Sequence, residues 1–160
     1  MLFRFRRFVP PVIRPLRSDR AEPCAAIHAA AFAHSWSAAE FETLLSSKTT
    51  IGGAAIDAPS NALRGFAISR LAADEAEILT IAVDSAVRNR GVGRALMNDA
   101  ISRLRQARAR SLFLEVEQAN LAAIALYGRL GFREVGQRQG YYRKQDGSAA
   151  TALVLRKDLP

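Results

Sequence analysis

The sequence predicts an α/β protein, with one mixed sheet of about seven strands and helices on both of its faces. Three observations predict this class. Apolar strand-like runs and amphipathic helical segments follow each other in the order β-α-α-β-β-β-α-β-α-β-β. Residues 77–83 form a nearly continuous β-branched apolar run, which is typical of a strand covered on both sides. With 160 residues, 49% of them apolar, the chain is long enough to bury the core of one domain.

The N-terminal residues are expected to lie outside this domain. Residues 1–11 alternate aromatic residues with arginines and show no helical or strand face, so they are interpreted as a flexible basic and aromatic arm. The domain then comprises residues 12–160. Its first strand is expected at residues 12–16, where Pro15 restricts it to a sheet edge or a strand end because proline cannot donate to a ladder.

Two helices are expected next, and each begins with a capping box. The first is expected to start at residues 18–19, with Glu22 as the acidic partner, and to run to about Phe32. The second opens with Ser37 and Glu40. The residues of this short helix that are expected to point inward are Phe41, Leu44 and Leu45.

The rest of the chain alternates strands and helices. Residues 50–56 and 63–71 predict a hairpin joined by a turn-rich loop at residues 57–61. The strand at residues 77–83 leads into an amphipathic helix that reaches Leu104. The later elements are expected to be strands at residues 111–116, 132–137 and 152–155, a helix at residues 120–130 stopped by Gly131, and loops at Gly140-Tyr141-Tyr142 and Asp146-Gly147.

Composition narrows the function classes. The single cysteine, Cys24, excludes an internal disulfide and suits the reducing cytoplasm, where we expect the protein. No apolar run approaches the ~20 residues of a membrane span, so no membrane partner is expected. Neither His28 nor His34 has further ligands at metal spacing, and no metal site is predicted. His28 is expected to have a surface or packing role.

The net charge of +8 has two interpretations. It fits a surface that faces nucleic acid or the ribosome, or a field that attracts an anionic cofactor. The arginines are scattered, apart from a cluster at Arg88, Arg90 and Arg94, and no exposed aromatic residues are reliably placed beside them. This pattern favours the cofactor and predicts no sequence-specific binding of nucleic acid.

The arginine cluster lies in a turn with the pattern Arg-x-x-Gly-x-Gly, between the strand at residues 77–83 and the next helix. A helix start after such a turn directs several free backbone N–H groups toward one anion, and the helix dipole adds to the attraction. Gly91 and Gly93 would let a phosphate approach the backbone closely. The nucleotide-triphosphate loop and the dinucleotide fingerprint both need residues that are absent here. A plain structural turn is the alternative.

Glu115 is the leading candidate for a general base. It lies in the apolar strand at residues 111–116, on the face of Phe113 and Glu117, whereas Leu114 and its neighbours at alternate positions share the other face. Burial and the nearby acid at Glu117 would both raise its pKa, as suits a base that works near neutral pH. An ion pair with one of the many arginines is the alternative.

Asn120 and Tyr127 accompany it on the following helix. They are about two turns apart and therefore lie on the same face. Tyr127 stands in an aliphatic segment, where its phenol is well placed to donate a proton. The alternative is that Tyr127 is a core aromatic residue whose hydroxyl is bonded to the backbone. Asn120 can cap the helix or bind an amide of a ligand.

Several motifs of the C-terminal half resemble one family. The arginine–glycine turn resembles the acyl-coenzyme A pyrophosphate loop of the GNAT acetyltransferases. The segments 114–116 (Leu-Glu-Val), 120–127, 130–132 (Leu-Gly-Phe), 33–37 and 140–142 resemble the ribosomal-protein-alanine N-acetyltransferases, the RimI type. The resemblance covers nearly everything from Ile13 to Leu159. It implies the GNAT fold and the transfer of an acetyl group from acetyl-CoA, the cosubstrate. The implied acceptor is the N-terminal alanine of the eighteenth small-subunit ribosomal protein, and association with the ribosome would be compatible with this acceptor.

The resemblance also implies roles for individual residues. Glu115 matches the general base and Tyr127 the general acid to the departing thiolate. The positions matched to cofactor contacts are Ile81, Ala82, Val83, Arg88, Asn89, Arg90, Gly91, Val92, Gly93, Arg94 and Asn120, and those matched to the acceptor are Trp36, Glu117, Tyr141 and Tyr142.

Two departures bear on the acceptor. Glu117 stands where the family commonly has arginine. Ser148-Ala149 stand where, in the family, an acidic pair often follows the Asp-Gly turn. If Glu115 and Glu117 form an acidic spot in a basic cleft, acceptors that begin Ala-Arg are expected to be preferred over Ala-Asp. The alternatives are a GNAT enzyme that acts on a small amine or a lysine side chain, and a non-catalytic module that senses CoA or binds the ribosome.

Overall fold

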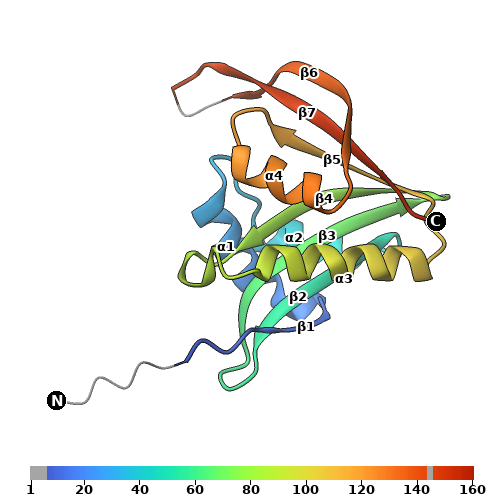
Figure 1. Ribbon diagram of the computed structural model, residues 1–160. Coiled ribbons are helices and arrows are strands. Elements are labelled where there is room, and N and C mark those ends of the chain that lie inside the picture. Colours follow the sequence, from blue (N-terminus) through green and yellow to red (C-terminus); the bar gives the residue numbers. More distant parts are fainter. Residues whose placement is uncertain (1–6, 144–145) are drawn as a thin grey trace.

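The computed structural model describes residues 7–143 and 146–160, and the side chains of residues 7–140 and 146–160. It contains one seven-stranded sheet in the order β1-β2-β3-β4-β5-β7-β6 (Figure 1). Neighbouring strands are antiparallel except for the parallel pair β4–β5. The fold class and the order of the elements are as the sequence predicts. The strands are β1 Val12–Pro15, β2 Thr50–Asp57, β3 Ala62–Ala72, β4 Glu75–Val83, β5 Ser111–Glu117, β6 Arg133–Arg143 and β7 Ala149–Asp158.

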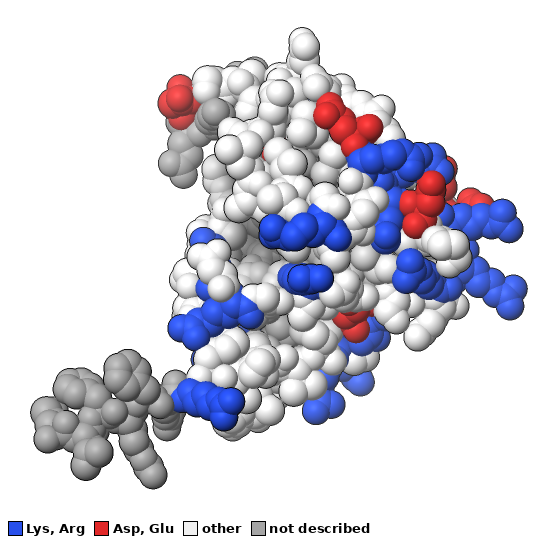
Figure 2. All heavy atoms as spheres, in the orientation of Figure 1, with Lys and Arg blue, Asp and Glu red and all other residues white. Residues whose placement is uncertain are grey.

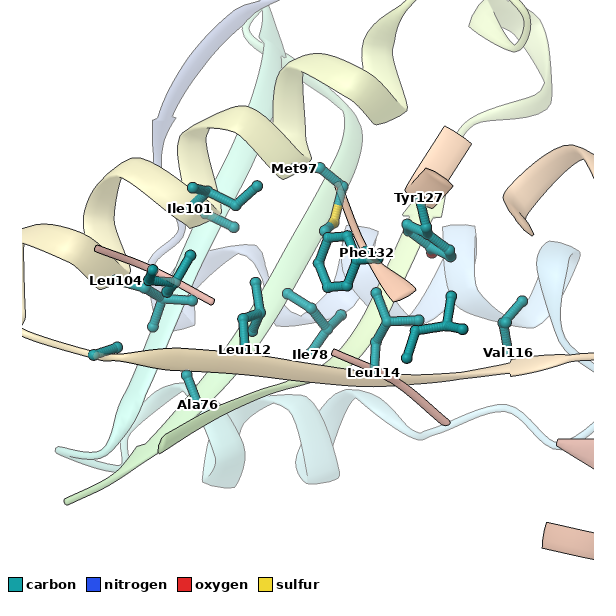
Figure 3. Close-up of a cluster of buried hydrophobic side chains, with 14 of the residues drawn as sticks. Ala76, Ile78, Met97, Ile101, Leu104, Leu112, Leu114, Val116, Tyr127 and Phe132 are labelled. Atoms are coloured by element: carbon teal, nitrogen blue, oxygen red, sulfur yellow. The ribbon is translucent and has the colours of Figure 1, made fainter. Parts of the chain in front are cut away.

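Helices cover both faces of the sheet (Figure 1). Helices α1 (Ala21–Ala31) and α2 (Ala38–Leu45) pack on one face, over β2, β3 and β4. Helices α3 (Val92–Gln106) and α4 (Leu121–Arg129) lie on the other face, where their side chains share one buried cluster with β5 (Figure 3). None of the helices in the described residues is long and apolar enough to cross a membrane.

Strand β5 divides its side chains between the two faces by strict alternation. Leu112, Leu114 and Val116 are buried in the cluster beneath α3 and α4, whereas Phe113 and Glu115 are partly exposed on the opposite face. This is the arrangement that the two-residue period of a strand dictates. The predicted division of β5 is therefore confirmed.

Strand β4 contains an irregularity that sets the direction of its last residues. Thr80 is opposite Ile68, but Ile78 is opposite Ser69, so Leu79 is an extra residue in the ladder with β3. The extra residue shifts the alternation, and Ile78 and Ile81 both contact the core on the α3 side. The C-terminal end of β4 thus directs Ile81, and with it Val83, toward α3.

Several local predictions are confirmed. The side chain of Ser37 accepts from the backbone N–H of Glu40 at 3.2 Å, and a Glu40 carboxylate oxygen accepts from the N–H of Ser37 at 2.7 Å, which completes the capping box. Gly131 ends α4 with a φ of 88°, a left-handed conformation that favours glycine. Pro15 is the last residue of the edge strand β1. Cys24 is fully buried, and burial raises the pKa of its thiol to about 12.

The predicted capping box at the first helix is wrong. Residues 18–20 form a 3₁₀ turn, and α1 begins at Ala21 without a side-chain cap. Pro23 explains the shift, because its missing N–H costs nothing in the first turn of a helix, and starting at Ala21 places it there.

The predicted loop at residues 140–142 is also wrong. The backbone of β6 continues to Arg143 and pairs with a β7 that is longer than expected at both ends. Gly140 has a φ of 67°, and the register shifts between Arg138 and Tyr142. The strand therefore absorbs the glycine as an irregularity and resumes beyond it.

Candidate active site

The site begins where two neighbouring strands separate. Strands β4 and β5 pair only at residues 75–77 with residues 111–113, although β4 continues to Val83 and β5 to Glu117. Beyond Phe113 the two strands no longer form a ladder, so the sheet opens between them. A backbone edge without a strand partner can bind an extended ligand through main-chain hydrogen bonds. The opening lies next to Ile81 and Val83 on one side and Glu115 on the other.

The start of α3 closes one end of this opening. Gly91 is the N-cap residue, with a φ of 81° and no side-chain cap, so the first N–H groups of the helix receive no capping side chain. A Cβ atom built on Gly93 would lie 3.8 Å from Leu126 Cδ2 and 3.9 Å from Val83 Cγ2. The start of α3 therefore lies beside the end of β4 and beside α4, next to the opening.

The basic residues of the turn are held in different ways. Arg88 Nε donates to the carbonyl oxygen of Val83 at 3.2 Å, which ties the turn to the end of β4. The guanidinium of Arg90 lies 4.6 Å from the centroid of the Phe8 ring, a cation–π contact with the N-terminal segment. Asn89 has a φ of 58°, which asparagine tolerates better than most residues, while Val92 is buried and Arg94 exposed. Figure 2 shows lysine and arginine side chains spread over this side of the molecule.

Glu115 lies on the face of the sheet opposite to α3 and α4, and its side chain is only 16% exposed. Its Oε1 is 3.0 Å from Nε of Arg138, a residue of β6. The carboxylate lines a hollow of about 360 Å³ together with Phe113 and Val154. The ion pair that the sequence left open is thus present. Arg138 places a positive charge directly beside Glu115, and the acidic spot expected of Glu115 and Glu117 stays a prediction.

Tyr127 reaches the same strand from the other side. Figure 3 shows its ring above Leu114 and Val116, on the α4 side of β5. The residue is 6% exposed, and its ring packs edge-on against Phe132 with 5.8 Å between the centroids. Asn120 is the N-cap of α4, and its Oδ1 accepts from the N–H of Ala123 at 3.2 Å. The capping role of Asn120 is confirmed, and its contact with a cofactor stays a prediction.

The residues predicted to bind the acceptor are less uniformly placed. Trp36 is partly buried, and its ring stacks on the His28 ring with 4.9 Å between the centroids. The backbone N–H of Trp36 donates to Nδ1 of His28 at 3.2 Å. His28 is buried, as a packing role predicts, and burial lowers its pKa although Glu40 opposes the shift. The loop before α2 is thereby anchored to the core. Glu117 lies at the end of β5. The backbones of Tyr141 and Tyr142 belong to β6, but their side chains lie outside the described residues.

Comparison with known proteins identifies the family. The profile described as Acetyltransferase (GNAT) family matches residues 17–132. The chain belongs to the GNAT acetyltransferase family. The match includes the opening between β4 and β5 and the start of α3, so the predicted family and fold are confirmed.

Two GNAT relatives show how far the sequence similarity extends. The N-alpha-acetyltransferase RimI of Mycobacterium tuberculosis (strain ATCC 25618 / H37Rv) is 36% identical over 157 residues, which cover 93% of each chain. The [Ribosomal protein bS18]-alanine N-acetyltransferase of Escherichia coli (strain K12) is 44% identical over 85 residues. That alignment covers 53% of this chain, and the chain spans only 57% of the length of that relative.

Solved structures extend the similarity over the whole domain. The crystal structure of the ribosomal-protein-S18-alanine N-acetyltransferase from Escherichia coli superposes with a TM-score of 0.85 and 31% identity, covering 92% of this chain and 93% of that one. The complex of Arabidopsis thaliana NAA60 with a bisubstrate analogue superposes with a TM-score of 0.81 at 23% identity, covering 92% and 97% of the two chains, and shares the fold.

Sequence reasoning missed two residues near this GNAT site. Arg138 lies beyond the predicted end of its strand at residue 137, so its face in the sheet was not considered. Continued alternation through Gly136 and Arg138 would have placed it on one face of β6. Phe8 was assigned to the arm, yet its ring contacts Arg90 of the turn. No pattern in the sequence links these two residues.

Proposed function

We propose that this GNAT protein is an N-alpha-acetyltransferase that moves the acetyl group of acetyl-CoA to the N-terminal amine of a protein. The observation that carries the proposal is the opening between β4 and β5, which has Glu115 on one face of the sheet and Tyr127 on the other. A carboxylate and a phenol on opposite sides of one opening suit a reaction in which an amine and a thioester meet there.

The thioester is expected to lie along the free edge of β4. Backbone groups of Ile81, Ala82 and Val83 would bind the pantetheine arm, and a backbone N–H near Val83 would polarise the thioester carbonyl. The pyrophosphate would bind at residues 88–94, where the N-terminus of α3 favours an anion. Asn120 would add a contact to an amide of the cofactor.

The chemical step is a direct attack. The nitrogen of the neutral amine attacks the thioester carbonyl, and Glu115 takes the proton that the nitrogen loses, directly or through a water molecule. The C–S bond then breaks, and the phenol of Tyr127 protonates the departing thiolate to give free CoA. Solvent removes the proton from Glu115 and restores that of Tyr127, so acids and bases balance over one turnover.

The acceptor proposed is the N-terminal alanine of the eighteenth small-subunit ribosomal protein. The Escherichia coli relatives are named for this acceptor, and the relative from Mycobacterium tuberculosis is named an N-alpha-acetyltransferase. Trp36, Glu117, Tyr141 and Tyr142 are the residues proposed to contact the acceptor chain. A cytoplasmic location and contact with the ribosome during acetylation belong to the same proposal.

Two measurements test the proposal. Mass spectrometry of ribosomal proteins should show that the acetyl group on this N-terminus disappears in a strain that lacks the gene. Purified protein should convert acetyl-CoA and a peptide with a free N-terminal alanine to CoA and acetylated peptide. Unchanged acetylation in the strain would exclude this acceptor, and an absence of turnover on every amine would favour a non-catalytic CoA-binding module.

Cofactor binding has its own test. A Gly93→Val side chain is expected to block the approach of a phosphate to the backbone donors at the start of α3, so CoA affinity measured by calorimetry should fall strongly while the fold persists. Gly93→Ala is the matched control, because its Cβ would make only ordinary van der Waals contacts within the protein. Equal affinity in the folded valine variant would exclude the phosphate site.

A further inference from the structure

The carboxylate of Glu115 is covered by an arginine from the outermost strand of the sheet. Nε of Arg138 lies 3.0 Å from Oε1 of Glu115, and the two side chains differ in exposure, at 57% for Arg138 and 16% for Glu115. The carboxylate is therefore a largely fixed group of the sheet face. The guanidinium lies mostly in solvent, where it meets any molecule that approaches Glu115 from the hollow.

The strand register explains how Arg138 reaches Glu115. Arg138 is opposite Ala152 on β7, and Glu115 is opposite Val154 on the other edge of the same strand. The arginine therefore extends diagonally over β7, where neither of these two residues carries a charge. Register shifts on both sides of Arg138, at residues 134–136 and 138–142, limit the regular pairing around it to a short segment.

The other charges near this pair can be assigned by element. Strand β5 itself adds Glu117, on the same face as Glu115. On β7 the guanidinium of Arg156 lies 5.3 Å from the centroid of Phe113, and its Nε is 3.0 Å from Asp158. Arg70 of β3 and Glu75 and Glu77 of β4 line the same hollow, and Arg70 lies 3.4 Å from Glu77. Of these charged groups, Arg138 is the cation in contact with the proposed base.

We propose that Arg138 determines which amines reach Glu115, by repelling those that arrive with a positive charge. This inference rests on the proposed function, in which Glu115 receives the amine proton. At pH 7.4 about a quarter of N-terminal α-amines are neutral, but only about one in a thousand lysine ε-amines. A bare carboxylate would attract the ammonium form of both. Arg138 offsets that attraction at Glu115, so the amine that is readily neutral is favoured.

The test compares two peptides of otherwise equal sequence. One has a free N-terminal alanine and no lysine, and the other is acetylated at its N-terminus and carries one lysine near that end. The ratio of kcat/KM for the two peptides is measured at pH 7.4 with acetyl-CoA for wild type, Arg138→Gln and Arg138→Lys. Arg133→Gln is the matched control, because Arg133 lies on the same strand but pairs with Asp158 at 3.3 Å.

Arg138→Gln should lower the preference for the α-amine about tenfold, mainly through a higher kcat/KM for the lysine peptide, because Glu115 could then bind the lysine ammonium and deprotonate it within the site. Arg138→Lys should keep most of the preference, since the positive charge remains. Arg133→Gln should match wild type. A purely structural role of Arg138 would lower the activity on both peptides together and would leave their ratio unchanged, which would overturn the proposal.

A second measurement needs no variant. Raising the salt concentration screens the charge of an exposed guanidinium, so the preference of the wild type for the α-amine should decline from 0.05 M toward about 0.5 M salt. A preference that does not change with salt would contradict a charge filter even if Arg138→Gln fails to fold. If wild type converts neither peptide, the proposed function fails, and that result is distinct from an unchanged ratio.

Discussion

The two faces of β5 differ sharply in burial and charge. On the α4 face, Leu114 and Val116 are buried under Tyr127 in a continuous apolar cluster. On the other face, Phe113 and Glu115 line a hollow that charged side chains surround. One strand thus supplies the core with its even-numbered residues and the proposed reaction with an odd-numbered one.

The difference shows how an enzyme can position a carboxylate rigidly without burying it completely. The backbone of β5 is fixed by the packing of one face and by the ladder with β7, so Glu115 projects from a rigid element. A functional group on such an element is positioned more accurately than one on a loop. Substitutions on the two faces should therefore have separable effects, on rate for the hollow and on stability for the core.

The largest effect is expected at Glu115. Glu115→Gln preserves the shape of the side chain and removes the base, so kcat/KM should fall by about 10²–10⁴ at pH 7 while CoA affinity is kept. The loss should be smaller at high pH, where the amine loses its proton unaided. Steady-state kinetics from pH 6 to pH 10 measure both.

Glu75→Gln is the matched control, because Glu75 lines the same hollow at the start of β4. It should retain nearly full activity. Parallel pH profiles for wild type and Glu115→Gln would remove Glu115 from the role of base and leave it as the partner of Arg138.

The next largest effect is expected on the core face, in stability. Leu114 is 2% exposed, and Leu114→Ala should lower the free energy of unfolding by about 2–5 kcal/mol through lost burial and a cavity. Leu121→Ala makes the same change at a leucine that is 74% exposed, so it should cost less than about 0.5 kcal/mol. Denaturant titration compares the two, and equal losses would contradict the division of β5.

That division could be predicted from the sequence because it depends on local rules alone. The two-residue period of a strand places Leu114 and Glu115 on opposite faces whatever surrounds them. The Ser37–Glu40 box and the left-handed Gly131 are local in the same way. The first helix shows the limit, since the serine–acid pattern at residues 18–22 competes with Pro23 for the helix start.

The surroundings of Glu115 could not be predicted, because they depend on register. Arg138 reaches Glu115 only through the pairing of β6 with β7 and of β7 with β5. A shift of one residue in either ladder would turn Arg138 to the other face. Because of the irregularities in β6, that register cannot be predicted from the sequence. The contact of Arg90 with Phe8 depends in the same way on where the N-terminal segment packs.

Tyr127 tests whether the core face also takes part in the reaction, with a smaller expected effect. Tyr127→Phe keeps the ring that packs on Phe132 and removes one hydroxyl. It should lower kcat by about 10²-fold, the lower end for acid–base catalysis, because a thiolate needs less help to leave than an alkoxide. Single-turnover kinetics isolate the chemical step. An unchanged rate in that step would make Tyr127 a core aromatic residue only.

The smallest effect is expected from an ion pair that lines the hollow. Arg70 and Glu77 are directly opposite each other on β3 and β4, 3.4 Å apart, with side chains 53% and 47% exposed. A double-mutant cycle with Arg70→Gln and Glu77→Gln should give a coupling energy of about 0.2–1 kcal/mol, since water screens an exposed pair. The coupling should shrink further in 1 M salt. A coupling above about 2 kcal/mol that persists in salt would mean that the hollow excludes water.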